Sequence, residues 1–363
     1  MRKGLLIMMV ALGACGGTAA PTTSGEPAAP STSRTSSTSA LATTTPTTLP
    51  ATTVTPTTEP TPTTIAPSAE PAGVLIGNSS GIFFAPLGDE PRPVADGPVI
   101  AVRDDLAGGL VVQFAGPEGR PGVVSHVPAE GNPWMVLAPE SNGWVTLEDV
   151  ERIGGNPTVV ATVRTRSGNP DAERLTLETI DLTTRERRQV AVIGGHESGA
   201  GPASADPEGF VVNRYVVAES SVEFLDPDGE ARRPPFNPNP ECKDDVTCPR
   251  SVVASADGHL LAYLVTVPGD GVADGVDLVV VDATTGEEVA REGLPIAGFA
   301  TVGVDIVGEF VLVNRLAAGT SGEPTEPTFP MVLDLGSGEL TEIPFAGVAS
   351  LARTDPAITG PLR

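Results

Sequence analysis

The chain has 363 residues, with 46 acidic residues against 22 lysines and arginines and a formal net charge of −24 at pH 7. A chain this acidic is repelled by nucleic acid and by anionic lipid surfaces, so we expect no nucleic-acid partner. It contains two tryptophans and two tyrosines, too few for a base-stacking surface. The acidity indicates mainly a need for solubility, although it can also attract cations or a basic partner.

The N-terminal segment has the order of an export signal. Arg2 and Lys3 precede an apolar run from Leu5 to Leu12, and the small pair Gly13-Ala14 stands directly before Cys15. A run of about eight residues falls far short of the roughly 20 that span a bilayer, but it fits the apolar region of a signal peptide. The cysteine at the cleavage point resembles the lipobox of bacterial lipoproteins. An ordinary signal peptide with an incidental cysteine is the alternative.

The lipobox resemblance implies an address for the mature protein. Residues 1–14 are then a signal peptide, residues 15–17 begin the mature chain, and Cys15 is diacylated on its sulfur. Two acyl chains, such as palmitate, hold a protein stably on a membrane where one chain does not. We therefore expect an extracytoplasmic protein that is anchored to the cell membrane as a lipoprotein.

Residues 18–72 consist almost entirely of Thr, Pro, Ser and Ala, as in the stretch 43–48 (TTTPTT). They show no apolar periodicity and cannot bury enough surface to offset chain entropy, which predicts a disordered linker. A Pro-rich spacer of this length reaches at most about 170 Å. Ser/Thr-Pro tracts also suit O-glycosylation, which we treat as a hypothesis.

Two cysteines remain once Cys15 is assigned to the lipid. Cys242 and Cys248 lie six positions apart in an exported chain, which favours a local disulfide that closes a small loop. A metal site is the alternative, but it needs further His or Cys ligands nearby, and none adjoins this pair.

Residues 73–352 read as strand after strand, with apolar runs of five to eight residues separated by Gly, Pro, Asp and Asn. Four runs end alike in an aspartate, a short turn and a more polar strand; we call these the turn aspartates Asp181, Asp226, Asp282 and Asp334. Two weaker hairpins near Ala85 and Val127 extend the series, with steps between 42 and 56 residues. A strand-built period of about 40–50 residues is typical of a β-propeller.

One repeat also carries a family pattern. The stretch 255–263 (SADGHLLAY) places a turn before an apolar strand, and the strand that ends at Asp282 is followed by a Thr-Gly turn. Residues 251–290 thus resemble the WD40-like repeat of the TolB-type propellers, with partial matches at 200–230 and 299–345. The resemblance implies a propeller fold and, as a partner, another envelope protein. It says far more about fold than about function.

Four strands per blade predict an all-β domain with six blades. The complete blades are expected at about 97–139, 143–194, 200–236, 250–294 and 298–345. Three strands precede them, and one strand at 348–351 is left over, so pairing strands from both ends closes the ring and hides its edges. Seven blades, or a β-sandwich arrangement, are the alternatives. Residues 353–363 are then a C-terminal tail.

Candidate catalytic motifs are few. Gly77-Asn78-Ser79-Ser80-Gly81 matches G-x-S-x-G, but it lies between two strand-like runs instead of a strand and a helix, which indicates a hairpin turn. Asn78 also begins a glycosylation sequon. The three histidines, His126, His196 and His259, are far apart and form no metal-ligand pair, and His259 follows a turn. We expect no catalytic residue and no cofactor.

An acidic stretch offers three weak calcium candidates, Asp270, Asp274 and Asp277. Carboxylates on a Gly-rich loop suit Ca²⁺, but their spacing matches no EF-hand, and an acidic hairpin loop is the simpler interpretation.

The favoured function is a non-catalytic scaffold, a monomer that binds an envelope protein, a cell-wall component or another ligand. One alternative is an envelope hydrolase or lyase, which predicts acidic residues clustered at one mouth of the propeller channel. The other is a solute-binding or sensory lipoprotein, which predicts a closed, apolar-lined pocket.

Overall fold

The computed structural model describes residues 70–116, 121–140, 143–166, 169–196, 198–216, 219–238, 249–268, 273–294, 299–318, 324–327 and 329–358. Cys15, most of the segment 18–72 and the pair Cys242 and Cys248 lie outside these residues, so the lipidation, the linker and the disulfide stay predictions. Among the described residues the only helix is a short 3-10 turn, η2 (Pro170–Ala172). No helix in this part of the chain is long and apolar enough to cross a membrane.

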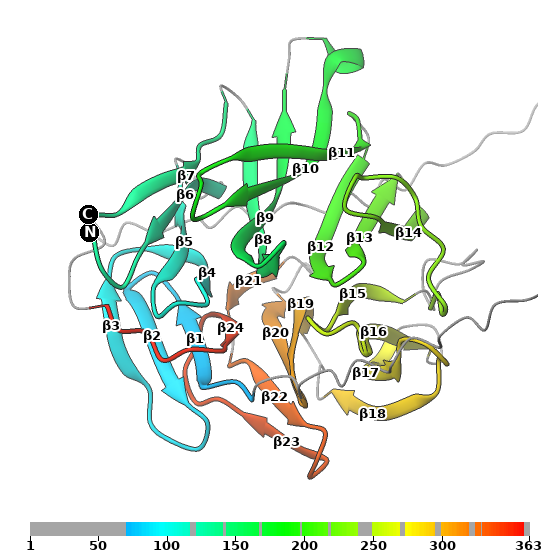
Figure 1. Ribbon diagram of the computed structural model, residues 1–363. Helices are drawn as coiled ribbons and strands as arrows, with labels where there is room; N and C mark the ends of the chain where they lie inside the picture. The colour runs from blue at the N-terminus through cyan, green and yellow to red at the C-terminus, as the bar shows by residue number, and fades with distance from the viewer. Residues whose placement is uncertain are drawn as a thin grey trace, which may run out of the picture. The chain divides into compact units, whose positions relative to one another are not determined.

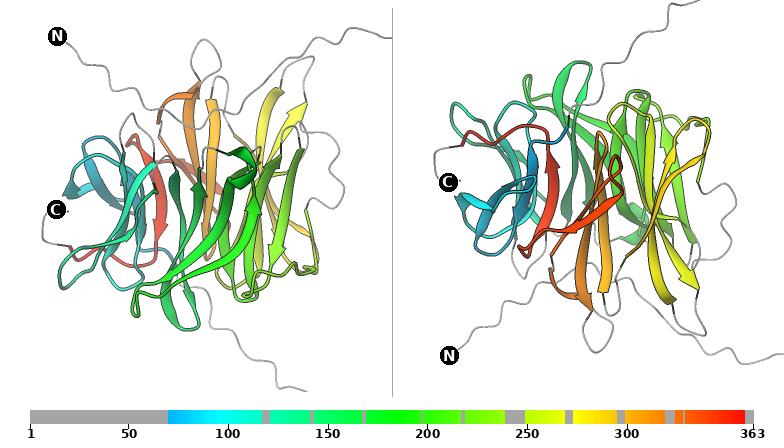
Figure 2. Two further views of the ribbon diagram at one scale, coloured as in Figure 1. Left: turned by 90° about the horizontal axis from the view of Figure 1, so that it is seen from above. Right: turned by 90° about the horizontal axis from the view of Figure 1, so that it is seen from below.

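The strands form six antiparallel sheets around a common centre, which is the expected six-bladed β-propeller (Figures 1 and 2). From the centre outwards, blade I contains β24 (Val348–Ala352), β1 (Gly73–Gly77), β2 (Gly81–Pro86) and β3 (Arg92–Asp96). Blade II contains β4 (Val99–Asp104), β5 (Leu110–Ala115), β6 (Pro121–Val127) and β7 (Trp134–Leu137). Blade III contains β8 (Trp144–Ile153), β9 (Asn156–Thr165), β10 (Arg174–Asp181) and β11 (Arg187–Gly194).

The remaining blades follow in chain order. Blade IV contains β12 (Ser198–Asp206), β13 (Gly209–Val216) and β14 (Glu219–Leu225). Blade V contains β15 (Arg250–Ala254), β16 (Leu260–Pro268), β17 (Ala273–Asp282) and β18 (Glu288–Leu294). Blade VI contains β19 (Phe299–Val307), β20 (Phe310–Ala318), β22 (Met331–Asp334) and β23 (Glu339–Glu342), with β21 (Pro324–Pro327) also paired to β20.

The last strand closes the ring. β24 pairs antiparallel with β1 along its whole length, from Gly73 opposite Ala352 to Gly77 opposite Val348. Figure 1 shows the red β24 beside the blue β1. The pairing confirms that the spare strand completes the blade begun by the first three strands, and it fixes the count at six.

The regular spacing of the turn aspartates has a structural cause. Each of the six positions in the series, from Ala85 to Asp334, lies at or next to the end of the third strand of its blade. In each turn aspartate Oδ1 accepts hydrogen bonds from two backbone N–H groups of the turn that follows. This local bonding folds the chain back towards the fourth strand, so the motif recurs once per blade.

The hydrophobic core is divided into six clusters, one between each pair of adjacent blades. Successive residues of one strand face different clusters. In β17, Leu278 and Val280 pack towards blade VI, whereas Val279 and Val281 pack towards blade IV. Burial on both faces explains why such strands are continuously apolar and do not alternate.

Blade IV departs from the expected four strands. Beyond β14 the described residues add only an isolated bridge between Leu225 and Ala231. Pro234 and Pro235 follow directly, and proline has no N–H to donate to a ladder, so a regular fourth strand cannot form there. After these prolines, Phe236 packs on the hydrophobic cluster between blades IV and V.

Three amide side chains tie neighbouring blades together. Each lies on the second strand of its blade and bonds both a backbone C=O and a backbone N–H on the first strand of the next. These amide clamps, with distances between 2.5 and 3.0 Å, are Gln113 on Val145 and Leu147, Asn213 on Val252, and Asn314 on Ala349. A buried amide with satisfied partners sets the register between blades as well as stabilising them.

Candidate functional site

Charged side chains gather at the centre of the ring. Five carboxylates and two guanidinium groups from blades I, II, III and VI form what we call the channel cluster: Arg103, Asp104, Glu148, Asp149, Glu151, Asp305 and Arg353. Asp149 and Asp305 come from opposite blades and still interact electrostatically. The cluster therefore joins blades that are not neighbours in the ring, as Arg353 after β24 does with Glu151 on β8.

Arg353 links the closing strand to two other blades. It follows β24 and forms a two-pronged ion pair with Glu151 on β8, with Nη1–Oε1 at 2.7 Å and Nη2–Oε2 at 2.5 Å. The backbone N–H groups of Arg353 and Thr354 both donate to Asp104, at 2.9 and 3.0 Å. Burial disfavours the charge of Arg353, but the hydrogen bonds and attraction of Glu151 outweigh it and raise the pKa of this guanidinium.

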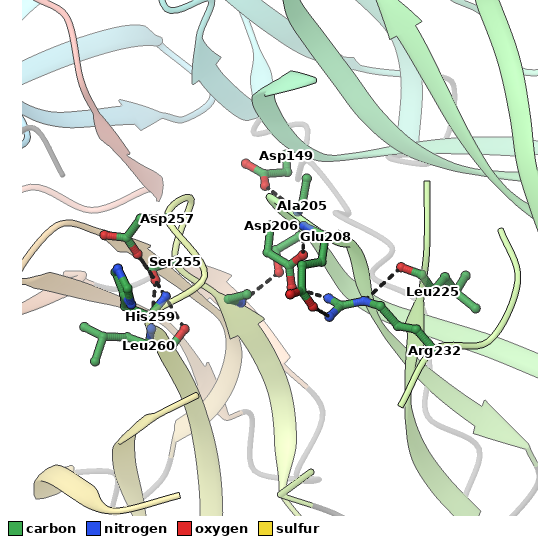
Figure 3. Close-up of polar contacts among 12 residues, drawn as sticks. Asp149, Ala205, Asp206, Glu208, Leu225, Arg232, Ser255, Asp257, His259 and Leu260 are labelled. Atoms are coloured by element: carbon green, nitrogen blue, oxygen red, sulfur yellow. Dashed lines mark hydrogen bonds and ion pairs between the residues drawn. The ribbon is translucent and has the colours of Figure 1, made fainter. Parts of the chain in front are cut away.

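Glu148 and Asp149 take the place of an amide clamp between blades III and IV. Glu148 accepts a hydrogen bond from the Thr162 hydroxyl at 2.7 Å and another from the backbone of Ala203. Asp149 accepts from the backbone N–H of Ala205 at 3.2 Å (Figure 3). Blade III has Thr162 on its second strand instead of an amide, so the carboxyl groups of the first strand make the contact.

Burial raises the pKa of three carboxyl groups in the channel cluster. The pKa of Glu148 rises to about 7, and those of Asp104 and Asp149 rise to about 6. After burial, the negative charges of Glu151 and Asp305 are the next causes of the shift at Asp149. Shifts of this kind occur at active sites and also in structural networks, so hydrogen-bond partners must decide between the two.

The partners in the channel cluster are protein groups. Asp305 accepts from the backbone N–H of Leu351 on the closing strand at 2.9 Å, as Asp104, Glu148 and Asp149 accept from other blades. Each of these carboxylates therefore bonds an inner strand or strand end of another blade. These hydrogen bonds between blades stabilise the closed ring.

A second polar network lies in blade II. His126 donates its Nε2–H to Asp105 at 2.8 Å and accepts the indole N–H of Trp134 at Nδ1, at 2.9 Å. The acceptor role of Nδ1 defines the neutral tautomer with its proton on Nε2. Because both ring nitrogens are bonded, His126 has none free to act as a general base.

A cavity of about 410 Å³ lies directly beside this network and opens to solvent between blades II and III. Its walls are mainly apolar, and its polar groups come from the turns and strand ends of the two blades. The lining residues are Asp105, Ala107, His126, Pro128, Ala129, Glu130, Pro157, Leu182 and Thr183. Asp105 and His126 are its buried polar members, with side chains that are 5% and 10% exposed.

The cavity belongs to one end of the propeller, which we call the turn face. It comprises the turns between first and second strands and between third and fourth strands: residues 87–91, 105–109, 128–133, 154–155, 182–186, 207–208, 226–230, 255–259, 283–287, 308–309 and 335–338. These turns carry twelve acidic residues and a single lysine or arginine, Arg185. The negative charge of the chain is thus concentrated where the cavity opens.

Blades IV and V show how the turn face is built. Arg232 forms ion pairs with Asp206 and Glu208 and also donates to the carbonyl of Leu225 (Figure 3). In the next blade the Ser255 hydroxyl donates to Asp257 at 2.6 Å, and Asp257 accepts from the backbone N–H of His259 at 3.1 Å. The blade IV turn is thus held by an arginine from the far end of its own blade, and the blade V turn by hydrogen bonds within the turn.

The G-x-S-x-G segment, His196 and His259 lie outside the cavity lining. Residues 77–81 form the turn between β1 and β2, which confirms the hairpin interpretation of G-x-S-x-G. The Asn78 amide accepts from Ser80 and Gly81 and donates to Ala346, so its side chain is committed to the turn. His259 is exposed, and His196 pairs with Glu173 at 2.9 Å beside blade III.

The calcium candidates are not brought together by what the structure describes. Asp270 lies outside the described residues, and the side chain of Asp274 is not described. Asp277 forms an ion pair with Arg291 at 3.0 Å. No group of three His, Cys, Asp or Glu side chains is placed to hold a metal ion in the described part of the chain.

Sequence reasoning missed the amide clamps and the channel cluster. The sequence does contain a pattern that could predict the clamps. An amide residue follows two apolar residues in the second strand of three blades, at Gln113, Asn213 and Asn314. A single polar residue in an otherwise buried strand needs a partner. No such pattern predicts the channel cluster, because Asp104, Glu151 and Arg353 are far apart in the chain.

Comparison with known proteins assigns neither a family nor a function to this chain. No family model and no curated protein matches the chain. Similar solved structures include a nidogen/laminin complex (14% identity, TM-score 0.49, 77% of this chain and 98% of that chain). They also include an oligogalacturonate lyase in complex with manganese (12%, 0.39, 73% and 70%) and a putative TolB from Agrobacterium tumefaciens (11%, 0.31, 78% and 81%). At these identities and TM-scores they carry no argument about function. By its own strand pairing the chain is a six-bladed β-propeller.

Proposed function

We propose that this protein is a binding scaffold that holds a partner outside the cytoplasmic membrane and catalyses no reaction. The observation that supports this most is that, in the described part of the chain, the histidine beside the cavity and two buried carboxylates of the channel are already bonded within the fold. Both ring nitrogens of His126 are bonded, and the carboxylates of Glu148 and Asp149 bond blade IV. The partner is an envelope protein or a cell-wall component.

The anchor in this proposal is a lipid on Cys15, and residues 18–72 are the spacer. A long Pro-rich segment gives the propeller reach without adding a binding surface. The anchor is tested by growing the producing cells with a clickable fatty acid. We expect label on the wild-type chain, with no label and release into the medium for Cys15→Ser. Equal labelling of both chains would contradict the anchor.

The binding function is tested by affinity capture of the lipidated, full-length chain from membranes of the producing cell, after cross-linking. We expect one envelope component to be recovered repeatedly, and to be lost when the propeller is unfolded before capture. Recovery of nothing specific from intact envelopes, over several growth conditions, would contradict the proposal.

An envelope hydrolase or lyase is the second candidate, because Glu148 and Asp149 combine raised pKa values with a place in the channel. Its test is turnover of wall polysaccharides and peptides by the wild-type chain, Glu148→Gln and Asp149→Asn. The scaffold proposal expects no turnover by any of them. Activity that both substitutions abolish, with the fold retained, would favour the enzyme.

A further inference from the structure

The cavity between blades II and III has a polar floor and apolar walls. At the floor, Asp105 Oδ1 accepts from the backbone N–H groups of Ala107 and Gly109, at 2.8 and 2.7 Å. Oδ2 accepts from His126. A carboxylate has about four acceptor positions, so these three bonds leave one position on Oδ2 for a further donor, and Asp105 lines the cavity.

The walls are apolar and the rim is acidic. Pro128, Ala129, Pro157 and Leu182 supply hydrocarbon surface, and the exposed Glu130 stands at the rim. A long basic side chain matches this order, because its methylene stem packs against apolar groups while its charged head seeks a carboxylate. The lining residues include two carboxylates and no lysine or arginine.

Two arginines border the cavity, and their charges oppose a second cation. Arg152 donates to the carbonyl of Leu106 at 2.9 Å, and the guanidinium of Arg185 lies 4.7 Å from the centre of the Trp134 ring. Both are outside the lining. The surrounding turn face is strongly acidic, so the field at longer range attracts basic groups and speeds their approach.

We propose that this cavity takes a lysine or arginine side chain of the partner protein, with its charged head at Asp105 and its stem between blades II and III. The inference rests on the proposed binding function and adds a partner chemistry to it. It makes the partner a protein with an exposed basic residue, and it makes the turn face the docking side.

The test uses the indole N–H of Trp134, which donates to His126 at the cavity floor. The chain has two tryptophans, so Trp134 and Trp144 give the only two indole signals in an NMR spectrum of the ¹⁵N-labelled full-length chain. Trp144 lies at the start of β8, away from the cavity, and serves as an internal control. The probes are N-acetyl-arginine amide, N-acetyl-lysine amide and the uncharged N-acetyl-norleucine amide.

We expect the two basic probes to shift the Trp134 signal with dissociation constants on the order of 1–10 mM, and norleucine to bind at least about threefold more weakly. Trp144 should not move. Equal shifts by all three probes would overturn the preference for a cation, and no shift by any of them would overturn the site.

Matched variants separate charge from space. Glu130→Gln should weaken the basic probes about threefold, whereas Glu287→Gln removes the same charge from another turn of this face and should leave them unchanged. Ala129→Leu fills the cavity and should abolish binding. Arg185→Gln removes a like charge and should tighten binding; unchanged or weaker binding would count against the proposed cation.

The same variants distinguish this inference from the proposed function. If affinity capture recovers a partner with the wild-type chain but loses it with Ala129→Leu, both stand. If Ala129→Leu and Glu130→Gln still capture the partner in full, the scaffold proposal survives and the cavity assignment falls. Melting temperatures equal to wild type would show that the variants are folded.

Discussion

The turn aspartates and the carboxylates of the channel cluster respond to folding in opposite ways. Hydrogen bonds from the turn that follows hold the pKa of Asp282 and Asp334 below their ordinary value, and both side chains are solvated. In the channel, burial raises the pKa of Glu148 and Asp149 instead. The same chemical group thus marks a locally folded turn in one region and a long-range junction in the other.

The comparison shows which contacts couple the blades during unfolding. A turn aspartate bonds groups of its own blade, mostly within four positions of itself, with Asn156 of β9 as the more distant donor to Asp181, so its contribution survives in a single blade. Asp104 and Asp305 bond strand ends far away in the sequence, at Arg353 and Leu351, so their contribution exists only when the ring is closed. Damage to the channel should therefore loosen the whole propeller, and damage to a turn should loosen one corner.

The largest effect is expected at the closing ion pair. Arg353→Met leaves Glu151 buried without its cation, which should cost about 3–5 kcal/mol of unfolding free energy. The measurement is the urea midpoint of the full-length chain. The double variant Arg353→Met with Glu151→Gln should recover part of the loss, because no buried charge is then left unpaired. Single-variant stability equal to wild type would show that the pair does not close the ring.

A smaller effect is expected from pH. A carboxyl group with a raised pKa binds more protons in the folded state, so it stabilises the fold below its unfolded pKa and loses that contribution as pH rises to its folded pKa. For Glu148 and Asp149 this window runs from about pH 4 to about pH 7. The melting temperature should be about 5 °C lower at pH 8 than at pH 5.

Glu148→Gln is the control for this pH effect, since an amide keeps the shape without titrating. It should flatten the fall between pH 5 and pH 8, whereas Glu130→Gln at the turn face should not. A wild-type melting temperature that rises over this range would contradict the raised pKa values.

The smallest effect is expected at a turn aspartate. Asp282→Ala removes acceptors for the backbone N–H groups of Thr284 and Thr285 in an exposed turn. The loss of stability should be well below that of Arg353→Met. It should shrink as pH falls from about 4 through the lowered pKa of the folded state, because Asp282 then becomes protonated and contributes less as a carboxylate. Hydrogen exchange should quicken in the turn after β17 alone. Faster exchange across all six blades would erase the distinction between the two regions.

The sequence predicted most of the fold and little of the site. The period of the turn aspartates, the spare strand at 348–351 and the continuous apolar run at 278–281 led to six blades and a shared closing blade, and the structure confirms all three. The sequence was expected to form four strands in blade IV, whereas the described residues form three, and Pro234 and Pro235 are the signal for this difference. The acidic channel was an expectation of the enzyme alternative only, without named residues.

By itself the amino-acid sequence determined what depends on neighbours in the chain: strands, turns and their repeat. It also predicted an export signal and a lipid on Cys15, and both stay predictions. Only the tertiary structure decided which carboxylates meet at the centre, because ring closure brings Arg353 to Glu151 across 202 positions. The packing of blade III on blade II places Leu182 and Asp105 in the wall of one cavity. Local patterns carry no information on such distances, since contacts between blades depend on how six sheets pack together.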